Sequence, residues 1–97
     1  MKNGLIVNSG GDKEWYLNGK LHREDGPAIE YVDGDKEWWL NGQRHREDGP
    51  AIELYFYDID KRWWLNGKEY TQEEHWELTH PYEFIEKHNR LNCIDEE

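Results

Sequence analysis

The sequence predicts a mainly β protein, an antiparallel meander of β-hairpins that ends in two short C-terminal helices. Three observations predict this fold. A block of sequence repeats with a period of 23 residues, the dipeptide Asn-Gly recurs at the same place in each copy, and a helix-capping motif follows the last copy. A fixed period of this size is typical of arrays in which neighbouring units stack on one another.

The repeat covers most of the chain. Residues 12–30 return as residues 35–53 with only three differences. A third copy begins at Asp60 and matches as far as Tyr70, and the residues from Leu5 correspond to the second half of a unit. We therefore expect about two and a half units in residues 5–70, within one domain of residues 1–97.

Each unit is predicted to fold as a hairpin at its Asn-Gly dipeptide. These dipeptides are Asn18-Gly19, Asn41-Gly42 and Asn66-Gly67. Asn-Gly between apolar residues favours a two-residue turn, because both turn positions need a positive φ angle. In the first unit such a turn places Tyr16 opposite Leu21 and Trp15 opposite His22.

Side chains alternate between the two faces of a strand, so the register also predicts the faces. Trp15, Trp38 and Trp63 are expected on one face, which carries the positions that are identical between units. The opposite face is expected to carry Tyr16, Trp39 and Trp64, where the facing residues vary from unit to unit.

Asp33-Gly34 is a further turn signal between units. A two-residue loop here places Ile29 opposite Trp38 on the same face, and Glu30 opposite Glu37. Like charges directly opposite each other are unfavourable. A bulge at Gly34 is therefore the alternative.

Composition indicates where the core comes from. The chain has 97 residues, of which 35% are charged, and it contains six Trp, six Tyr and two Phe. Because aliphatic residues are few, the aromatic side chains are expected to supply most of the buried area. The formal charge of −10 argues against binding nucleic acid through its phosphates.

The unit Trp-(Tyr/Trp)-Leu-Asn-Gly-x-x-His-Arg-Glu-Asp-Gly-Pro-Ala-Ile-Glu resembles the MORN-variant repeats, relatives of the 23-residue MORN hairpin. Similar arrays occur in bacterial, bacteriophage and large-virus proteins. The resemblance covers residues 5–70 and implies a β-hairpin solenoid that serves as a scaffold for protein interaction or near a membrane. The chain departs from long arrays in being short and in ending with helical sequence.

The C-terminal residues 71–92 are predicted to form a helical cap, followed by an acidic tail of residues 93–97. Thr71 and Glu74 form a capping-box pattern, from which a helix is expected to run to about Leu78. Pro81 is suited to the first turn of a second helix. The two helices are expected to cover the open end or one face of the sheet.

Location is predicted from what the sequence lacks. It has no apolar run long enough to span a membrane and no secretory signal, and its single cysteine, Cys93, excludes an internal disulfide. These features indicate a cytoplasmic protein without membrane contact, located in the host cytoplasm if a phage encodes it.

No catalytic residues, metal site or cofactor are expected. His22 and His45 lie near acidic residues, but each is expected to pack against its facing Trp and bond locally. Zinc requires three or four converging ligands, and nothing in the sequence brings them together. The chain is therefore predicted not to be an enzyme.

Two surfaces are candidates for binding. The first is the varying face, with partner-binding anchors Tyr16, Trp39, Arg44 and Trp64, because aromatic residues and Arg are enriched at protein interfaces. The alternative for this face is that the C-terminal helices cover it. The second is an acidic surface formed by Glu24, Asp25, Glu47 and Asp48.

These surfaces give three functional hypotheses. The first is a non-catalytic module that binds a partner protein through the aromatic face. The second is a small acidic inhibitor of phage type, which occupies a nucleic-acid or defence enzyme of the host as a DNA mimic, in the manner of an anti-CRISPR protein. The third is a binder of a small molecule such as a nucleotide, through Arg23, Arg46 and the Trp rings. Exposed edges at both ends also make a homodimer compatible with the array.

Overall fold

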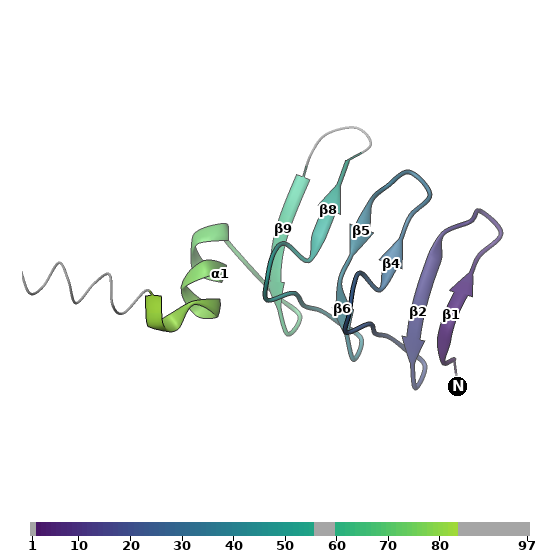
Figure 1. The fold of residues 1–97 in the computed structure, drawn as a ribbon, viewed down its shortest axis with the longest axis horizontal. Coiled ribbons are helices and arrows are strands. Elements are labelled where there is room, and N and C mark those ends of the chain that lie inside the picture. Colours follow the sequence, from purple (N-terminus) through teal and green to yellow (C-terminus); the bar gives the residue numbers. More distant parts are fainter. Residues whose placement is uncertain (1, 56–59, 84–97) are drawn as a thin grey trace, which may run out of the picture.

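The computed structural model describes residues 2–55 and 60–83. These residues form an antiparallel meander of short strands followed by one helix (Figure 1). The strands are β1 (Gly4–Val7), β2 (Lys13–Leu17), β3 (Lys20–Leu21), β4 (Ile29–Glu30), β5 (Lys36–Glu37), β6 (Trp39–Leu40), β7 (Gln43–Arg44), β8 (Ile52–Leu54), β9 (Asp60–Leu65) and β10 (Lys68–Tyr70). The prediction of a mainly β fold is confirmed.

The main sheet has the strand order β1-β2-β4-β5-β8-β9-β10, with β3 paired to β2. The strands β6 and β7 pair separately and form the hairpin of the second unit. In the first unit β2 pairs with β4 near its start and with β3 at its end. In the second unit these pairings are divided between β5, which pairs with β8, and β6, which pairs with β7. The units therefore lie side by side along a single sheet (Figure 1).

The three Asn-Gly turns form as predicted. Asn18, Asn41 and Asn66 have φ angles of 52°, 51° and 51°, and the glycine after each of them also has a positive φ angle. In the first unit Tyr16 pairs with Leu21, and the third unit repeats this register with Trp64 opposite Glu69. The predicted hairpin register is therefore confirmed.

The predicted register at Asp33-Gly34 is wrong. Ile29 pairs with Glu37 and Glu30 pairs with Lys36, so three residues rather than two form the loop. The amide of Gly34 donates to the Tyr31 carbonyl at 3.0 Å, and Gly34 has a φ angle of 100°. These are the features of a bulged three-residue turn, so the alternative of a bulge at Gly34 is the one that forms. The shift of one residue pairs Glu30 with a lysine instead of a glutamate, and it places Ile29 on the face opposite to the one predicted.

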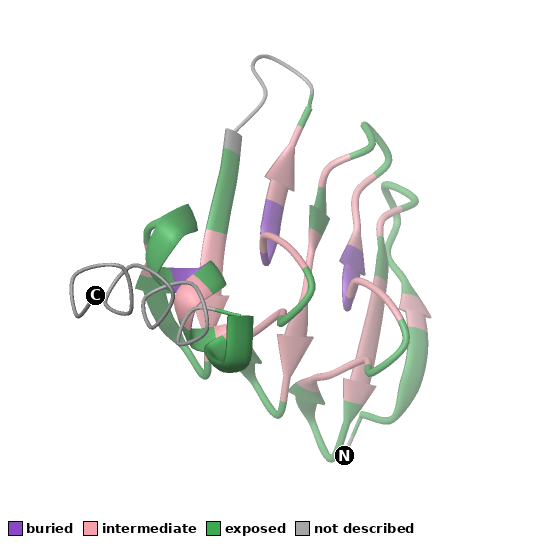
Figure 2. Cartoon of the chain, turned by 60° about the vertical axis from the view of Figure 1, so that its left-hand side comes forward, coloured by how far each residue is buried: buried purple, intermediate pink, exposed green. Residues whose placement is uncertain are grey.

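The fully buried part of the sheet is aliphatic. Among the described residues Ala28 and Ala51 are 0% exposed, and Ile29 and Ile52 are 6% and 7% exposed. The Trp rings of the sheet are half-buried, so the side chains that lose nearly all contact with water are aliphatic (Figure 2), while the share of buried area supplied by the aromatic residues stays a prediction. A single-layer sheet has no second layer to enclose large rings, so only small side chains near its midline lose all contact with water.

The histidines join neighbouring units. The Nδ1 atom of His22 accepts the amide of Asn41 at 2.9 Å, and His45 Nδ1 accepts the amide of Asn66 at 3.0 Å. The first turn receives the same contact from Asn3, whose Oδ1 accepts the amide of Asn18 at 2.8 Å. His22 and His45 therefore have the structural role expected. The Nε2 atom of each lies near a glutamate of its own unit, and the Nδ1 atom adds a bond to the next unit.

The helix α1 (Gln72–Thr79) contacts β9 and β10 at the end of the array. Both bonds of the predicted capping box between Thr71 and Glu74 are present. His75 is 4% exposed and its Nε2 lies 2.6 Å from the Arg46 carbonyl oxygen, which fixes the helix to the second unit.

The second predicted helix is only partly described. Residues 81–83 are helical, while the rest of that helix and Cys93 lie outside the described residues. In the part of the chain that the structure describes, no helix has the length and apolar character needed to cross a membrane.

Candidate binding surface

The two faces of the sheet use their aromatic residues differently. We call the face with Trp15, Trp38 and Trp63 the clamp face, and the face with Tyr16, Trp39, Arg44 and Trp64 the ladder face. The strand register assigns these faces, because residues that are directly opposite on neighbouring strands share a face.

On the clamp face an arginine lies over each of the first two Trp rings. The Arg23 guanidinium is 3.9 Å from the Trp15 ring centroid. It bonds to Asp25 at 3.0 Å, to the Pro27 carbonyl at 3.1 Å and to Glu30 at 2.8 Å. These bonds hold the loop after the hairpin against the sheet.

The second unit repeats this arrangement. Arg46 lies 3.7 Å from the Trp38 ring centroid and bonds to Asp48 at 2.9 Å and to Glu53 at 3.3 Å. A Cβ atom at Gly49 would approach the Arg46 Cζ atom to 2.8 Å, so any larger residue there must displace the guanidinium. The Arg-Glu-Asp-Gly-Pro sequence is therefore a structural clamp.

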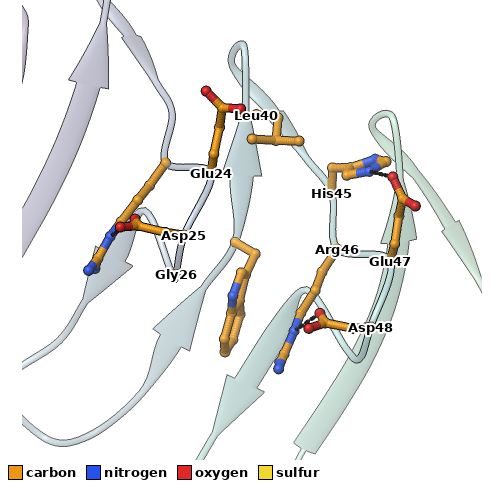
Figure 3. Close-up of a pocket in the computed structure, with 10 residues that line it drawn as sticks. Glu24, Asp25, Gly26, Leu40, His45, Arg46, Glu47 and Asp48 are labelled. Carbon is orange, nitrogen blue, oxygen red and sulfur yellow. Dashed lines mark hydrogen bonds and ion pairs between the residues drawn. The ribbon is translucent and has the colours of Figure 1, made fainter.

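A cavity of about 500 Å³ lies between the two clamp loops (Figure 3). Its rim carries the predicted acidic surface, with side chains of Glu24, Asp25, Glu47 and Asp48 that are 84%, 88%, 76% and 86% exposed. Each Asp is paired with the arginine of its own loop. The carboxylates of Glu24 and Glu47 lie 3.6 Å and 3.3 Å from Nε2 of His22 and His45. Because neither glutamate pairs with an arginine, their charge is less neutralised than that of the two aspartates.

On the ladder face Arg44 lies between two Trp rings from neighbouring units. Its guanidinium is 5.0 Å from the Trp39 centroid and 5.1 Å from the Trp64 centroid. The Arg44 side chain is 34% exposed. The structure thus brings three of the four predicted anchors into one stack.

Glu37 organises the centre of this stack. It accepts the Trp39 indole Nε1 at 3.0 Å and the Tyr31 hydroxyl at 2.7 Å, and it lies 3.6 Å from Arg44 Nε. Burial and the hydrogen bond to Glu37 raise the pKa of Tyr31 far above its ordinary value of 10.0. The hydroxyl therefore stays protonated and continues to donate.

The fourth anchor, Tyr16, lies one unit away and has different neighbours. Its hydroxyl donates to Glu14 at 2.9 Å, which raises the Tyr16 pKa, and Lys2 Nζ lies 4.9 Å from its ring centroid. Leu21 occupies the position that Arg44 has in the second unit. The first unit thus lacks a stacked arginine on this face.

Helix α1 does not cover the ladder face. The cavity between α1 and the second unit is lined by Trp63, His75 and Trp76 together with the second clamp loop, so the helix meets the clamp side of β9. Figure 2 places the helix and both clamp loops on the same side of the sheet. The aromatic side chains of the ladder face stay half-buried and accessible.

Sequence reasoning did not identify Tyr31 and Glu37 as part of this surface. Glu37 alternates with Trp39 along the strand, so its face could have been found by counting. Tyr31 could not, because the register error at Gly34 placed that strand on the wrong face.

Within the described ranges no group of three or more His, Cys, Asp or Glu residues is arranged to hold a metal ion. Comparison of the chain with protein-family models, with curated proteins and with solved structures finds no match. The resemblance to MORN-variant repeats therefore stays a prediction from the sequence.

Proposed function

We propose that the protein is a non-catalytic binding module that holds a partner protein on its ladder face. The observation that carries the proposal is the stack of Trp39, Arg44 and Trp64, which is accessible and spans two units. Trp, Tyr and Arg are the residues that most often dominate binding energy at protein interfaces.

The charges of this face are already paired within the protein. Glu37 has Tyr31, Trp39 and Arg44 around it, and Glu69 lies 3.8 Å from Arg62. Arg44 Nε and Trp64 Nε1 have no hydrogen-bond partner within the described residues, so a mainly apolar protein surface that brings a hydrogen-bond acceptor fits the face best. The side chains are also held in place before binding, which reduces the entropy lost on association.

A double variant tests this proposal. Trp39→Ala with Trp64→Ala removes both rings but leaves the clamp face unchanged. Partners captured from lysate by the wild-type chain would be identified by mass spectrometry, purified and titrated by calorimetry. The folded double variant is expected to lose at least tenfold in affinity, and binding should change little between low and high salt.

The matched control is Glu24→Gln with Glu47→Gln, which neutralises the acidic rim without altering the ladder face. Hydrogen exchange of the complex should show protection at strands β6, β7 and β9. Full affinity of the folded Trp double variant, or protection at the clamp loops instead, would refute the proposal.

The exposed acidic rim supports a second candidate, the inhibitor that occupies a basic groove as a nucleic-acid mimic. Four carboxylates that are at least 76% exposed stand on two successive loops. The pairing of Asp25 and Asp48 with arginines reduces the charge available to such a target. For this function the Gln control variant, and not the Trp double variant, would lose binding, and affinity would fall steeply with salt.

The third hypothesis, a nucleotide binder that uses Arg23 and Arg46, has less support. Both guanidinium groups already bond to a carbonyl and two carboxylates and lie against Trp rings. A phosphate would have to compete with these contacts.

A further inference from the structure

The first strand leaves an apolar sheet edge exposed. Strand β1 has the sequence Gly-Leu-Ile-Val, and the side chains of Leu5 and Val7 are 50% and 54% exposed. Proteins usually protect such an edge with charged residues, proline, a bulge or a covering segment. This strand contains no charged residue and no proline.

The hydrogen-bonding groups of this edge can be assigned from the register. Ile6 pairs with Glu14, and the amide of Asn8 bonds to the Asp12 carbonyl at 3.0 Å. Backbone groups in an antiparallel ladder alternate between the two sides of a strand. Leu5 and Val7 therefore direct their N–H and C=O groups away from β2.

The same edge is paired in each later unit. The carbonyls of Ala28 and Ala51 accept the amides of Trp15 and Trp38 at 2.8 Å in both cases. Leu5 stands 23 residues before Ala28, at the corresponding position. In the sheet formed by the described residues β1 is terminal, so its outer groups lack the strand that the later units have.

We propose that the outer edge of β1 binds β1 of a second copy of this chain, as an antiparallel pair about a two-fold axis. Ile6 lies on the axis opposite the second Ile6, and each Leu5 faces the Val7 of the other copy. The outward groups of Leu5 and Val7 form four backbone hydrogen bonds across the axis. This register places apolar side chains opposite apolar side chains on both faces.

Two observations favour a second copy over head-to-tail stacking. Strand β9 at the other end begins with Asp-Lys-Arg, so its edge is charged and does not match the apolar edge of β1. Strand β1 is antiparallel to its existing neighbour and brings no like charges together when it pairs with itself. A two-fold, self-complementary contact is the commonest form of association between identical chains. The proposal is independent of what binds the ladder face.

Sedimentation equilibrium over a range of concentrations tests the proposal. The mass is expected to rise from 11.8 kDa toward twice that value. A four-residue edge is much smaller than a standard interface, so we expect a dissociation constant of about 1 μM or weaker. Ile6→Lys places two like charges at the axis and should raise the dissociation constant at least tenfold. Val32→Lys, at a turn residue that is 67% exposed, is the matched control and should shift nothing.

A cross-link tests the register. Cβ atoms of directly opposite antiparallel residues are about 4.5–5.5 Å apart, close to disulfide distance. Ile6→Cys in a Cys93→Ser background should oxidise to a covalent dimer, whereas Val32→Cys in the same background should not. Wild-type protein that stays at 11.8 kDa at every concentration would overturn the proposal. A dimer that Ile6→Lys does not weaken, or that Ile6→Cys does not cross-link, would also overturn it.

Discussion

The clamp face and the ladder face differ in how they use the repeated and the varied residues of each unit. On the clamp face, identical residues in successive units make identical contacts, as Arg23 over Trp15 and Arg46 over Trp38 do. On the ladder face, Leu21 and Arg44 occupy equivalent positions and make different contacts. The comparison indicates that the repeated positions maintain the fold, whereas the varied positions can change without loss of the clamp contacts.

The largest difference should appear when the two adjacent tryptophans of the second unit are removed in turn. Trp38→Ala deletes the ring under Arg46 beside the buried Ala51, and it should cost about 3 kcal/mol of unfolding free energy. Trp39→Ala deletes a ladder ring and should cost about 1 kcal/mol, because Arg44 lies 5.0 Å from that ring, against 3.7 Å for Arg46 over Trp38, and keeps its contact with Trp64. Urea unfolding followed by tryptophan fluorescence measures both. Equal losses would contradict the division of roles.

A smaller loss is expected at the clamp loop. Gly49→Ala places a methyl group 2.8 Å from the Arg46 Cζ atom, so the guanidinium must shift from its position over the Trp38 ring. Loss of the stacking and its hydrogen bonds should reduce stability by about 1–2 kcal/mol. Gly10→Ala is the control, because its added Cβ would meet Asn8 at an ordinary 3.4 Å and should change stability little.

The unit-to-unit bond of His45 should contribute less. His45→Ala removes the acceptor of the Asn66 amide and should cost about 1 kcal/mol. The readout is faster hydrogen exchange of that amide, while exchange in the first hairpin stays unchanged. Asn3 makes the equivalent bond through a carboxamide, so His45→Asn should recover part of the protection. Unchanged exchange in His45→Ala would show that the bond does not couple the units.

The smallest effect at neutral pH concerns Tyr31. Its folded pKa lies above the unfolded value of 10.0, so its contribution to stability is complete below pH 10 and decreases as pH rises beyond it. The free energy of unfolding should therefore fall in alkaline solution. Tyr31→Phe should reduce this dependence, and the near-UV absorbance of tyrosinate would show one fewer late-titrating group. A pH dependence identical in the two proteins would contradict the role of the bond to Glu37.

Much of the fold could be predicted because its signals are local. Asn-Gly fixes a turn through the φ angles of two residues, and Thr71 with Glu74 fixes the start of a helix through bonds within one turn. The turn at Gly34 was less predictable. Asp-Gly is compatible with loops of two or three residues, and the pairing of Glu30 with Lys36 rather than with Glu37 favours the longer loop.

The candidate binding surface was predictable only in part, for a related reason. Alternation along a strand placed Trp39, Arg44 and Trp64 on one face, but it could not specify that the arginine lies between the two rings. That arrangement depends on the lateral offset between units, which the bond from Asn66 to His45 and the pairing of the neighbouring strands set together.

The sequence by itself determined the period, the hairpin turns, the hairpin register and the capped first helix, because each depends on residues close along the chain. The tertiary structure alone decided that small aliphatic residues, rather than tryptophans, become fully buried, and that the described helix lies on the clamp side. Both outcomes depend on how much water a single-layer sheet excludes, which is a property of the assembled units and not of any one segment.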